Sequence, residues 1–202
     1  MEPASPDAPP NIDLESAPPE PVEPGDEAPA APSNKWSANL HMEGVMLEQR
    51  PGRGAAGMGG VGAGLRYSVH PVVTLEIGVD SLLGTDYDGY DRSEQLVSFG
   101  SLLYLNPERQ VRTYAIVGFH SSVAHVEVDG VGQSWSYLGA QGGLGVEIPF
   151  DWRVALTFDL IGFVRGRTDS RAARQPEFTD DSGRVSNTSG GGLFRAGLSL
   201  RW

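Results

Sequence analysis

One stretch of the sequence combines side chains that could catalyse hydrolysis. In GFHSSVAHVE, His120 and Ser122 lie two positions apart, and Glu127 follows them. A histidine can act as general base for a serine hydroxyl, and a carboxylate can orient that histidine. In an extended strand His120 and Ser122 share one face, because alternate side chains point the same way. These three residues are therefore candidate catalytic groups, although polar residues near the end of a strand are ordinarily surface groups.

Two acidic segments could supply oxygen ligands for Ca²⁺. Asp86, Asp88 and Asp91 fall within DYDGYD, and DDSGR occupies 180–184. Neither has the spacing of an EF-hand loop or its closing glutamate, so solvated loops are expected. The glycine-rich run GMGGVGAG lacks the lysine and the following helix of a phosphate-binding loop. The chain has no cysteine, which excludes thiolate sites. We predict no metal site and no cofactor.

The net charge of −11 is distributed unevenly along the chain. Residues 1–34 hold 8 of the 26 acidic residues, 10 of the 15 prolines and no lysine or arginine. Such a segment buries too little apolar surface to offset its ordering entropy. We predict a disordered acidic Pro/Ala-rich tail, which is either a spacer or a docking peptide for a periplasmic partner. Residues 35–202 are nearly neutral, which argues against nucleic-acid binding through a basic face.

Targeting signals are not evident in the sequence. No stretch approaches the roughly 18 consecutive apolar residues of a transmembrane helix. Met1 leads directly into EPASPDAPP, without the basic and apolar regions of a signal peptide. If the protein is exported, we expect this sequence to be a mature form with an added methionine.

From Lys35 onward, apolar residues recur at every second position, which is the periodicity of β-strands with two different faces. The alternation is clear in six segments. It is less regular in two further β-rich segments, 95–105 and 111–127, where a bulge would explain the change of parity. No segment has the pattern of a helix. The six clear segments are 36–44, 61–70, 72–83, 138–148, 154–165 and 194–202.

The connections between these eight segments alternate in length. Short connections at 70–71, 106–110 and 149–152 follow the second, fourth and sixth segments. All prolines after residue 35 fall in connections, as expected because proline cannot donate to a β-ladder. Short turns at one rim and long loops at the other predict an all-β fold, an eight-stranded antiparallel up-and-down barrel over 35–202. The predicted long loops are 47–57, 82–95, 127–135 and 165–190.

The apolar face of such a barrel points inward in a soluble lipocalin-like carrier and outward in a membrane barrel. The opposite face is rich in glycine with single charges, and the chain has one lysine, which is unlike a solvent-exposed face. The apolar strips are long enough for tilted membrane strands. These features favour a transmembrane barrel, with the lipocalin-like small-ligand carrier as the alternative. Aromatic residues at strand ends are predicted to mark the membrane interfaces. They are Trp36, Trp135, Tyr137, Trp152 and Trp202.

The last ten residues, LFRAGLSLRW, alternate strictly and close in tryptophan. Over 35–202 the pattern resembles the small outer-membrane β-barrel family, of the outer-membrane protein A or X type. In that family the final strand ends in an aromatic residue and is read by the outer-membrane barrel assembly machinery. The resemblance implies the bacterial outer membrane, a periplasmic N-terminal tail, long loops outside the cell, and contact with outer-membrane lipid and lipopolysaccharide. The residues that match the assembly signal are Phe194, Ala196, Leu198, Leu200 and Trp202.

Charged residues of nearly balanced sign fall on the face predicted to point into the barrel. Buried charges must be paired, so we predict an ion-pair network that plugs the lumen. The alternative is a narrow, gated or ion-selective passage, although an eight-stranded interior is only just wide enough to be filled by side chains. The predicted network comprises Glu43, Arg66, Glu76, Asp80, Glu147, Asp159, Arg165, Arg195 and Arg201, with His41 and Gln141 nearby.

We expect a non-enzymatic integral outer-membrane protein that serves membrane integrity, surface interaction through its long loops, or both. The His-x-Ser spacing of His120 and Ser122 is also similar to that of outer-membrane lipid A deacylases, although Val123 stands where that family has asparagine. A lipid A-modifying hydrolase is therefore the alternative function. The soluble lipocalin-like carrier is the second alternative.

Overall fold

The computed structural model describes residues 35–48, 56–128, 130–172, 178–179 and 185–202. The chain divides into two units, Met1–Ser33 and Asn34–Trp202. The tail predicted over 1–34 and the acidic segment at 180–184 lie outside the described residues.

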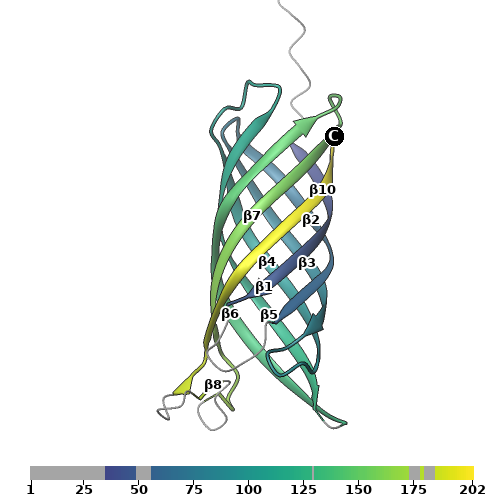
Figure 1. The fold of residues 1–202 in the computed structure, drawn as a ribbon. Coiled ribbons are helices and arrows are strands. Elements are labelled where there is room, and N and C mark those ends of the chain that lie inside the picture. Colours follow the sequence, from purple (N-terminus) through teal and green to yellow (C-terminus); the bar gives the residue numbers. More distant parts are fainter. Residues whose placement is uncertain (1–34, 49–55, 129, 173–177, 180–184) are drawn as a thin grey trace, which may run out of the picture. The chain divides into compact units, whose positions relative to one another are not determined.

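Eight long strands close into one barrel, in which each strand is antiparallel to both of its neighbours (Figure 1). Strands adjacent in the barrel follow one another along the chain, and the first strand pairs with the last. The predicted eight-stranded up-and-down barrel is therefore confirmed. The strands are β1 (Trp36–Leu47), β2 (Gly57–His70), β3 (Val73–Thr85), β4 (Asp91–Tyr104), β5 (Arg112–Val128), β6 (Val131–Pro149), β7 (Val154–Arg167) and β10 (Thr188–Arg201).

A separate two-stranded pair, β8 (Phe178–Thr179) and β9 (Val185–Ser186), lies between β7 and β10 in the chain. The sequence pattern did not predict it, because two residues are too few to show a period. Among the described residues, no helix is long and apolar enough to cross a membrane.

The strands are staggered around the barrel. A circuit that starts at Ser37 on β1 and steps between register partners through each strand returns to β1 at Leu47. The circuit therefore climbs ten residues toward the rim of the longer loops. Such a stagger requires strands that tilt relative to the barrel axis, as Figure 1 shows. It also decides which lumen residues meet, because side chains at one height come from different register positions.

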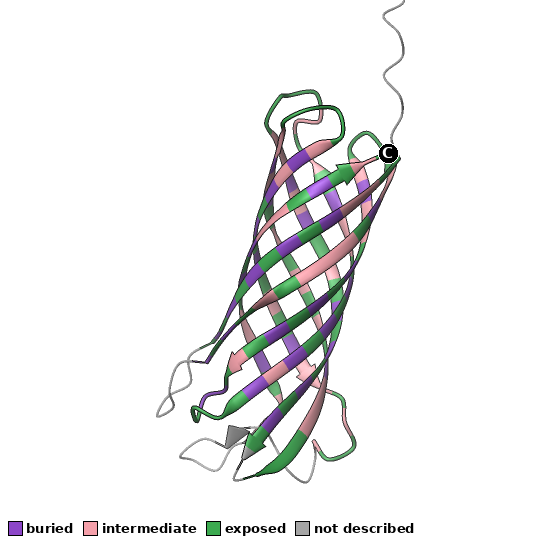
Figure 2. Cartoon of the chain, turned by 90° about the vertical axis from the view of Figure 1, so that its right-hand side faces the viewer, coloured by how far each residue is buried: buried purple, intermediate pink, exposed green. Residues whose placement is uncertain are grey.

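The two faces of the barrel wall are the reverse of those in a soluble carrier. Buried and exposed residues alternate along every strand (Figure 2). Leu40, Met42 and Val61 are exposed on the outer face, whereas His41 and Arg66 are buried. The predicted outward apolar face is thus confirmed, and the lipocalin-like alternative is wrong, because that fold would bury its apolar residues around a ligand.

The bulge expected in the less regular strands is absent, because the β4–β5 register runs without a shift from Arg92 to Tyr104. The alternation of apolar and polar residues is unclear in β4 and β5 because some of their lumen-facing residues are apolar, including Leu96, Leu102 and Ile116. The register shift that does occur lies at the end of β2, between Ser68 and His70.

Two of the predicted long loops are shorter than expected. Most of 127–135 belongs to strands, and Gly130 adopts a φ of +77° in the turn between β5 and β6. In that conformation a residue with a Cβ would be strained. The connection from β3 to β4 covers only 86–90, within the predicted 82–95. Polar strand extensions beyond the membrane read as loops in the sequence, because they lack an apolar face. Residues 49–55 of the first loop lie outside the described residues.

Candidate functional site: the barrel lumen

The lumen-facing residues of β1 change in character along the strand, and this change shows how the lumen is organised from one rim to the other. Its buried residues change from polar to apolar, from Asn39, His41 and Glu43 to Val45 and Leu47. The chain enters β1 at the rim of the short turns, so a charged region precedes an apolar one on the way to the longer loops. The other strands supply the partners of both regions.

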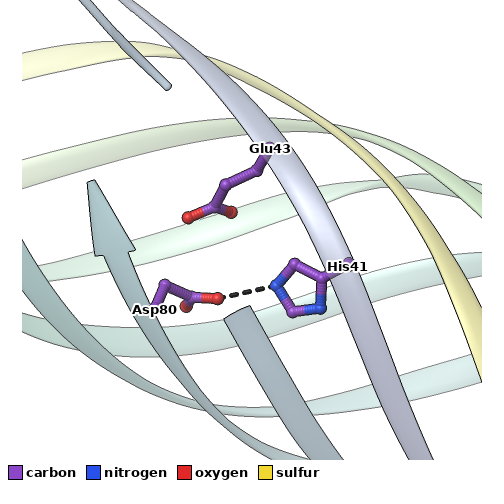
Figure 3. A group of neighbouring side chains, drawn as sticks. All are labelled: His41, Glu43 and Asp80. Atoms are coloured by element: carbon purple, nitrogen blue, oxygen red, sulfur yellow. Dashed lines mark hydrogen bonds and ion pairs between the residues drawn. The ribbon is translucent and has the colours of Figure 1, made fainter. Parts of the chain in front are cut away.

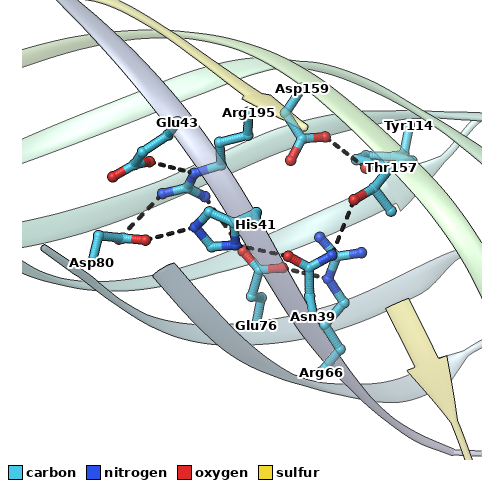
Figure 4. Close-up of polar contacts among 10 residues, drawn as sticks. All are labelled: Asn39, His41, Glu43, Arg66, Glu76, Asp80, Tyr114, Thr157, Asp159 and Arg195. Atoms are coloured by element: carbon cyan, nitrogen blue, oxygen red, sulfur yellow. Dashed lines mark hydrogen bonds and ion pairs between the residues drawn. The ribbon is translucent and has the colours of Figure 1, made fainter. Parts of the chain in front are cut away.

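The centre of the charged region is Arg195 on β10. Its Nε donates to Glu43 Oε2 at 3.0 Å, and its Nη2 lies 3.4 Å from Asp80 Oδ2 (Figure 4). Glu76 Oε1 is 3.8 Å from Nη1. One guanidinium therefore joins carboxylates from β1 and β3, of which Glu43 and Asp80 are almost fully buried and Glu76 is partly buried. Such a group is held together because removing any one partner would leave an unpaired buried charge.

His41 connects this cluster to a hydrogen-bonded chain. Its Nε2 lies 2.7 Å from Asp80 Oδ1, and its Nδ1 lies 2.8 Å from Asn39 Oδ1. Asn39 Nδ2 in turn donates to Thr157 Oγ1 on β7 at 3.0 Å. The chain crosses the lumen from β3 to β7, so it ties opposite walls together (Figure 4).

His41, Glu43 and Asp80 also present three potential metal ligands within 4.8 Å of one another (Figure 3). The guanidinium of Arg195 already contacts both carboxylates. A divalent cation would have to displace that positive charge, because two cations cannot share the same pair of carboxylates without strong repulsion. The residues present fit an ion-pair network better than a metal centre.

Nearer the short-turn rim, two further groups fill the lumen. Arg66 Nε donates to Glu76, and Tyr114 Oη donates to Asp159 Oδ1 at 2.6 Å. Asp159 was expected in the ion-pair network, but its close partner is this phenol. Gly145 faces this pair, and a Cβ there would overlap the Tyr114 ring and the Asp159 carboxylate. Small lumen residues thus make room for large polar ones.

Glu147 forms the outermost group at this rim. It pairs with Arg201 and lies 3.5 Å from Arg112 Nη1, and Tyr104 Oη donates to it at 3.4 Å. Neither Arg112 nor Tyr104 was among the predicted network residues. Both lie on β4 or β5, the strands whose faces the sequence pattern did not separate.

A second charged region lies toward the longer loops, around Glu94 on β4. Glu94 pairs with Arg165, and its Oε2 is 2.9 Å from Arg92 Nη2. Arg165 Nε donates to Ser189 Oγ at 3.0 Å, and its guanidinium carbon lies 4.3 Å from the Tyr137 ring centre. Sequence reasoning found Arg165 but missed Arg92 and Glu94, because both fall in the predicted loop 82–95, whereas β4 begins at Asp91.

Two of the five predicted interface aromatics belong to this region rather than to the lipid interface. Tyr137 is fully buried inside the barrel. Trp135 is half-buried, with the guanidinium carbons of Arg92 and Arg167 at 5.9 and 5.5 Å from its ring centre. The prediction was wrong for both, and their odd numbers, shared with the lumen-facing Gln141, were a signal of it. The other three, Trp36, Trp152 and Trp202, are exposed.

An apolar layer separates the two charged regions. Along β4, Leu96 lies between the lumen-facing Glu94 and Ser98. Along β7, Ile161 and Phe163 lie between Asp159 and Arg165. In the described part of the barrel, no ion pair crosses this layer. The polar side chains of His120 and Gln141 line the same layer. We call its apolar residues the septum: Val45, Met58, Leu82, Leu96, Ile161, Phe163 and Leu193.

Of the three candidate catalytic residues, His120 and Ser122 share a face of the barrel wall and Glu127 lies on the other. His120 and Ser122 face the lumen at 3 % and 2 % exposure, where His120 packs edge-on against Phe163. Glu127 has the opposite parity and is exposed on the outer side of β5. A His–Ser–acid arrangement that includes Glu127 is therefore wrong, since one strand cannot direct these residues to a common point.

The described acidic loop is stabilised by its own backbone. Asp86 Oδ1 accepts hydrogen bonds from the backbone N–H groups of Asp88 and Tyr90, both at 2.9 Å. This is an Asx-type turn, in which the carboxylate holds the loop.

Outside the membrane-spanning part, Asp151 organises the short β6–β7 turn in the same way. Its Oδ1 accepts from the backbone N–H groups of Arg153 and Val154 at 2.6 and 2.8 Å. These two hydrogen bonds favour the carboxylate and hold the pKa of Asp151 below its usual value.

The chain is similar to known outer-membrane barrels both in its sequence pattern and in its fold. The family model described as "Outer membrane protein beta-barrel domain" matches residues 27–189. Neisserial surface protein A is similar at a TM-score of 0.62 and 13% identity, over 83% of this chain and 97% of that one. The attachment invasion locus protein Ail of Yersinia pestis is similar at a TM-score of 0.53 and 13% identity, over 84% of this chain and 99% of that one. The N-terminal β-barrel domain of OprF from Pseudomonas aeruginosa is similar at a TM-score of 0.52 and 13% identity, over 82% of this chain and 97% of that one. No curated protein matches this chain in sequence.

Proposed function

Because this chain belongs to the outer membrane protein β-barrel domain family, and so to the bacterial outer membrane, we propose that it is a non-conducting, non-enzymatic barrel. It serves the integrity of that membrane, surface interaction through its long-loop end, or both. In this proposal the N-terminal tail lies in the periplasm. The C-terminal segment from Phe194 to Trp202, most of which belongs to β10, engages the barrel assembly machinery.

The septum is the main observation that supports a lumen closed to ions. Apolar constrictions stop ions because water and ions leave them, even where the backbone passage stays open. On either side, paired charges fill the lumen, so neither half offers a row of like charges for a permeating ion. This arrangement supports a plug rather than the ion-selective passage considered from the sequence.

The strand lengths support a role at the cell surface. β5 has 17 residues and β6 has 19, whereas a membrane crossing needs about 9–11. The hairpin that they form continues past the ends of its neighbours, since the last β6–β7 register pair is Tyr137 with Arg167. Two proteins of the same fold carry the descriptions "surface protein" and "attachment invasion locus". A projecting hairpin suits contact with other molecules.

The burial of His120 and Ser122 argues against the lipid A hydrolase. The buried His120 and Ser122 lie within the wall of a filled barrel, where an acyl ester in the membrane has no access to them. Glu127 is on the other face.

The closed state is tested by efflux of a small ion from lipid vesicles that contain the refolded protein. Leu82 is 2 % exposed in the septum, and the next residue, Leu83, is 68 % exposed on the outer face. We expect vesicles with the wild type to retain the ion and the Leu82→Ser/Leu96→Ser variant to leak. The matched control, Leu83→Ser, should retain it. Rapid efflux through the wild-type barrel would refute the proposal.

The surface role is tested separately by deleting residues 127–132, the tip of the β5–β6 hairpin. Cells that carry this variant should keep the barrel in the outer membrane and lose attachment to host or matrix surfaces. Unchanged attachment, together with normal resistance of a deletion strain to detergents, would leave neither role standing.

A further inference from the structure

An ionisable side chain lies within the apolar layer that closes the lumen. Of the two polar side chains that line this layer, Gln141 cannot ionise and His120 can. His120 is 3 % exposed, packs edge-on against Phe163 and lines a cavity of about 10 Å³. A cavity of this size has room for about one water molecule. The septum therefore surrounds a group that can acquire a charge.

His41 and His120 both face the lumen but differ in their partners. The two ring nitrogens of His41 are hydrogen-bonded, one with Asp80 and one with Asn39. The two ring nitrogens of His120 are buried and have no hydrogen-bond partner in the described part of the barrel. An apolar side chain of similar size would fill the layer better, because a buried polar group without a partner is unfavourable. His41 thus ties strands together, whereas His120 is placed in the septum at a cost to stability.

The barrel wall leaves room for this imidazole ring. Gly139 on β6 is the register partner of His120, and a Cβ at Gly139 would lie 2.6 Å from the ring atoms Cε1 and Nε2. Such a contact is too close for any residue larger than glycine, so the ring occupies the space that a side chain at 139 would need. Shape, rather than hydrogen bonding, holds the imidazole in the septum.

A proton on His120 would find no free carboxylate beside it. The charged groups close enough to act on its ring come from β4, β7 and β10, and they are Glu94, Arg165 and Arg195. The other strands around the cavity, β1, β2, β3 and β6, contribute the uncharged Val45, Met58, Leu82 and Gln141. Glu94 already pairs with Arg165. Arg195 already has Glu43 and Asp80 as partners. An imidazolium would therefore be an uncompensated positive charge in an apolar layer.

Protonation would change the septum from a dry layer to one that must admit water. A buried charge without a counter-charge is strongly unfavourable, and hydration relieves this cost. The cavity beside His120 gives the first water molecule its place. Apolar constrictions block ions by excluding water, so a hydrated septum loses its barrier. A fixed positive charge at the constriction favours anions over cations.

We propose that protonation of His120 opens the septum to small anions such as chloride, so that acidification converts the closed barrel into a narrow passage. The inference rests on the closed lumen given under Proposed function, which applies at neutral pH, where an imidazole is mostly uncharged. To that closed state it adds the condition under which the lumen opens, the residue that senses this condition and the class of solute that passes.

The test is chloride efflux from lipid vesicles that contain the refolded protein, measured from about pH 7.5 down to about pH 4.5, a range that includes the ordinary titration of histidine. We expect the wild type to retain chloride at neutral pH. Efflux should then rise about tenfold per pH unit while the uncharged imidazole predominates, because the protonated fraction rises in that proportion. His120→Leu, which cannot be protonated, should stay closed throughout. The matched control is His125→Leu, an exposed histidine on the outer face of the same strand, which should behave as the wild type.

A further variant, His120→Arg, carries a permanent charge and should leak already at neutral pH. If it does not refold, the comparison of the wild type with His120→Leu and His125→Leu still decides. Folding of each variant is verified by its faster migration in SDS gels when unboiled.

Acid-dependent efflux of the same size from His120→Leu would overturn His120 as the sensor. Retention of chloride by the wild type over the whole pH range would overturn the opening itself. A rise of about a hundredfold per pH unit would require two protons and so exclude a single histidine. Each of these results leaves the closed lumen at neutral pH standing, whereas efflux from the wild type at neutral pH would refute that proposed function instead.

Discussion

Arg195 and Glu43 are register partners across the seam at which the first and last strands close the barrel, and Arg195 Nε lies 3.0 Å from Glu43 Oε2. The two residues are 152 positions apart in the chain. Their ion pair therefore forms only when the circle of strands is complete. It couples barrel closure to the neutralisation of the central cluster, because Asp80 shares the same guanidinium.

Removing this guanidinium should be strongly destabilising. Arg195→Ala leaves Glu43 and Asp80 buried without their main cation, and breaking a buried pair in this way typically costs about 3–5 kcal/mol. The measurement is the free energy of unfolding by urea from lipid vesicles. Arg153→Ala is the control, because Arg153 stacks on the exposed Trp152 at 3.9 Å outside the lumen. Equal effects of the two substitutions would contradict the central role of Arg195.

Tyr114→Phe should be more harmful than Tyr104→Phe. Tyr114 Oη donates to Asp159 at 2.6 Å, whereas Tyr104 Oη is 3.4 Å from Glu147, which has two arginine partners besides. Loss of a hydrogen bond to a charged group costs about 1.5–3 kcal/mol. The same unfolding assay measures both variants. A larger loss for Tyr104→Phe would show that Asp159 has another adequate partner.

A methyl group should be rejected at Gly145, which faces the lumen, but tolerated at Gly142, which is exposed on the outer face of the same strand. A Cβ at Gly145 would overlap Tyr114 and Asp159, whereas at Gly142 its nearest neighbour would be the Ile116 carbonyl oxygen at 3.5 Å, an ordinary van der Waals contact. Overpacking of this kind costs about 1–3 kcal/mol. We expect Gly145→Ala to lower stability by this amount and Gly142→Ala to leave it nearly unchanged. Similar stabilities for both variants would mean that the lumen is looser than described.

Trp202 should matter for assembly more than for stability. Its side chain is exposed, and its backbone N–H donates to the Trp36 carbonyl oxygen at 3.1 Å, a bond that any residue except proline can make. Trp202→Ala should therefore slow insertion into the outer membrane of living cells and leave refolding into detergent nearly unchanged. Trp202→Phe should restore insertion. A parallel loss of refolding would assign the residue to stability.

The alternation of apolar and polar residues was sufficient to predict the barrel and the direction of its faces. Six strands show it because their lumen side carries glycine or charge, as at Gly62 and Asp80. β4 and β5 do not, because Leu96 and Ile116 face the lumen while Val97 and Val117 face outward. With apolar residues on both sides, parity disappears, and with it the sequence signal for Arg112. Arg92 and Glu94 were missed because they fall in the predicted loop 82–95, whereas β4 begins at Asp91.

Which charges meet could not be predicted in the same way. Parity places Arg195 and Asp80 in the lumen, but their contact depends on the stagger accumulated over several strand pairs. A slip of one residue in any pair would move every later side chain to the other face. The error at Tyr137 has a different cause. Its parity already indicated the lumen, but its aromatic character suggested the membrane interface.

The most direct test of the closed lumen is the conductance of single wild-type barrels in planar lipid bilayers. A lumen divided by the septum between two neutralised charged regions predicts insertion without current steps at moderate voltage in either polarity. Folding of the protein used is verified by its faster migration in SDS gels when unboiled, and the Leu82→Ser/Leu96→Ser variant, which should give current steps under the same conditions, verifies insertion. Stable, ohmic current steps from the folded wild-type protein would contradict the account, because they would require a continuous water-filled path through Leu82 and Leu96.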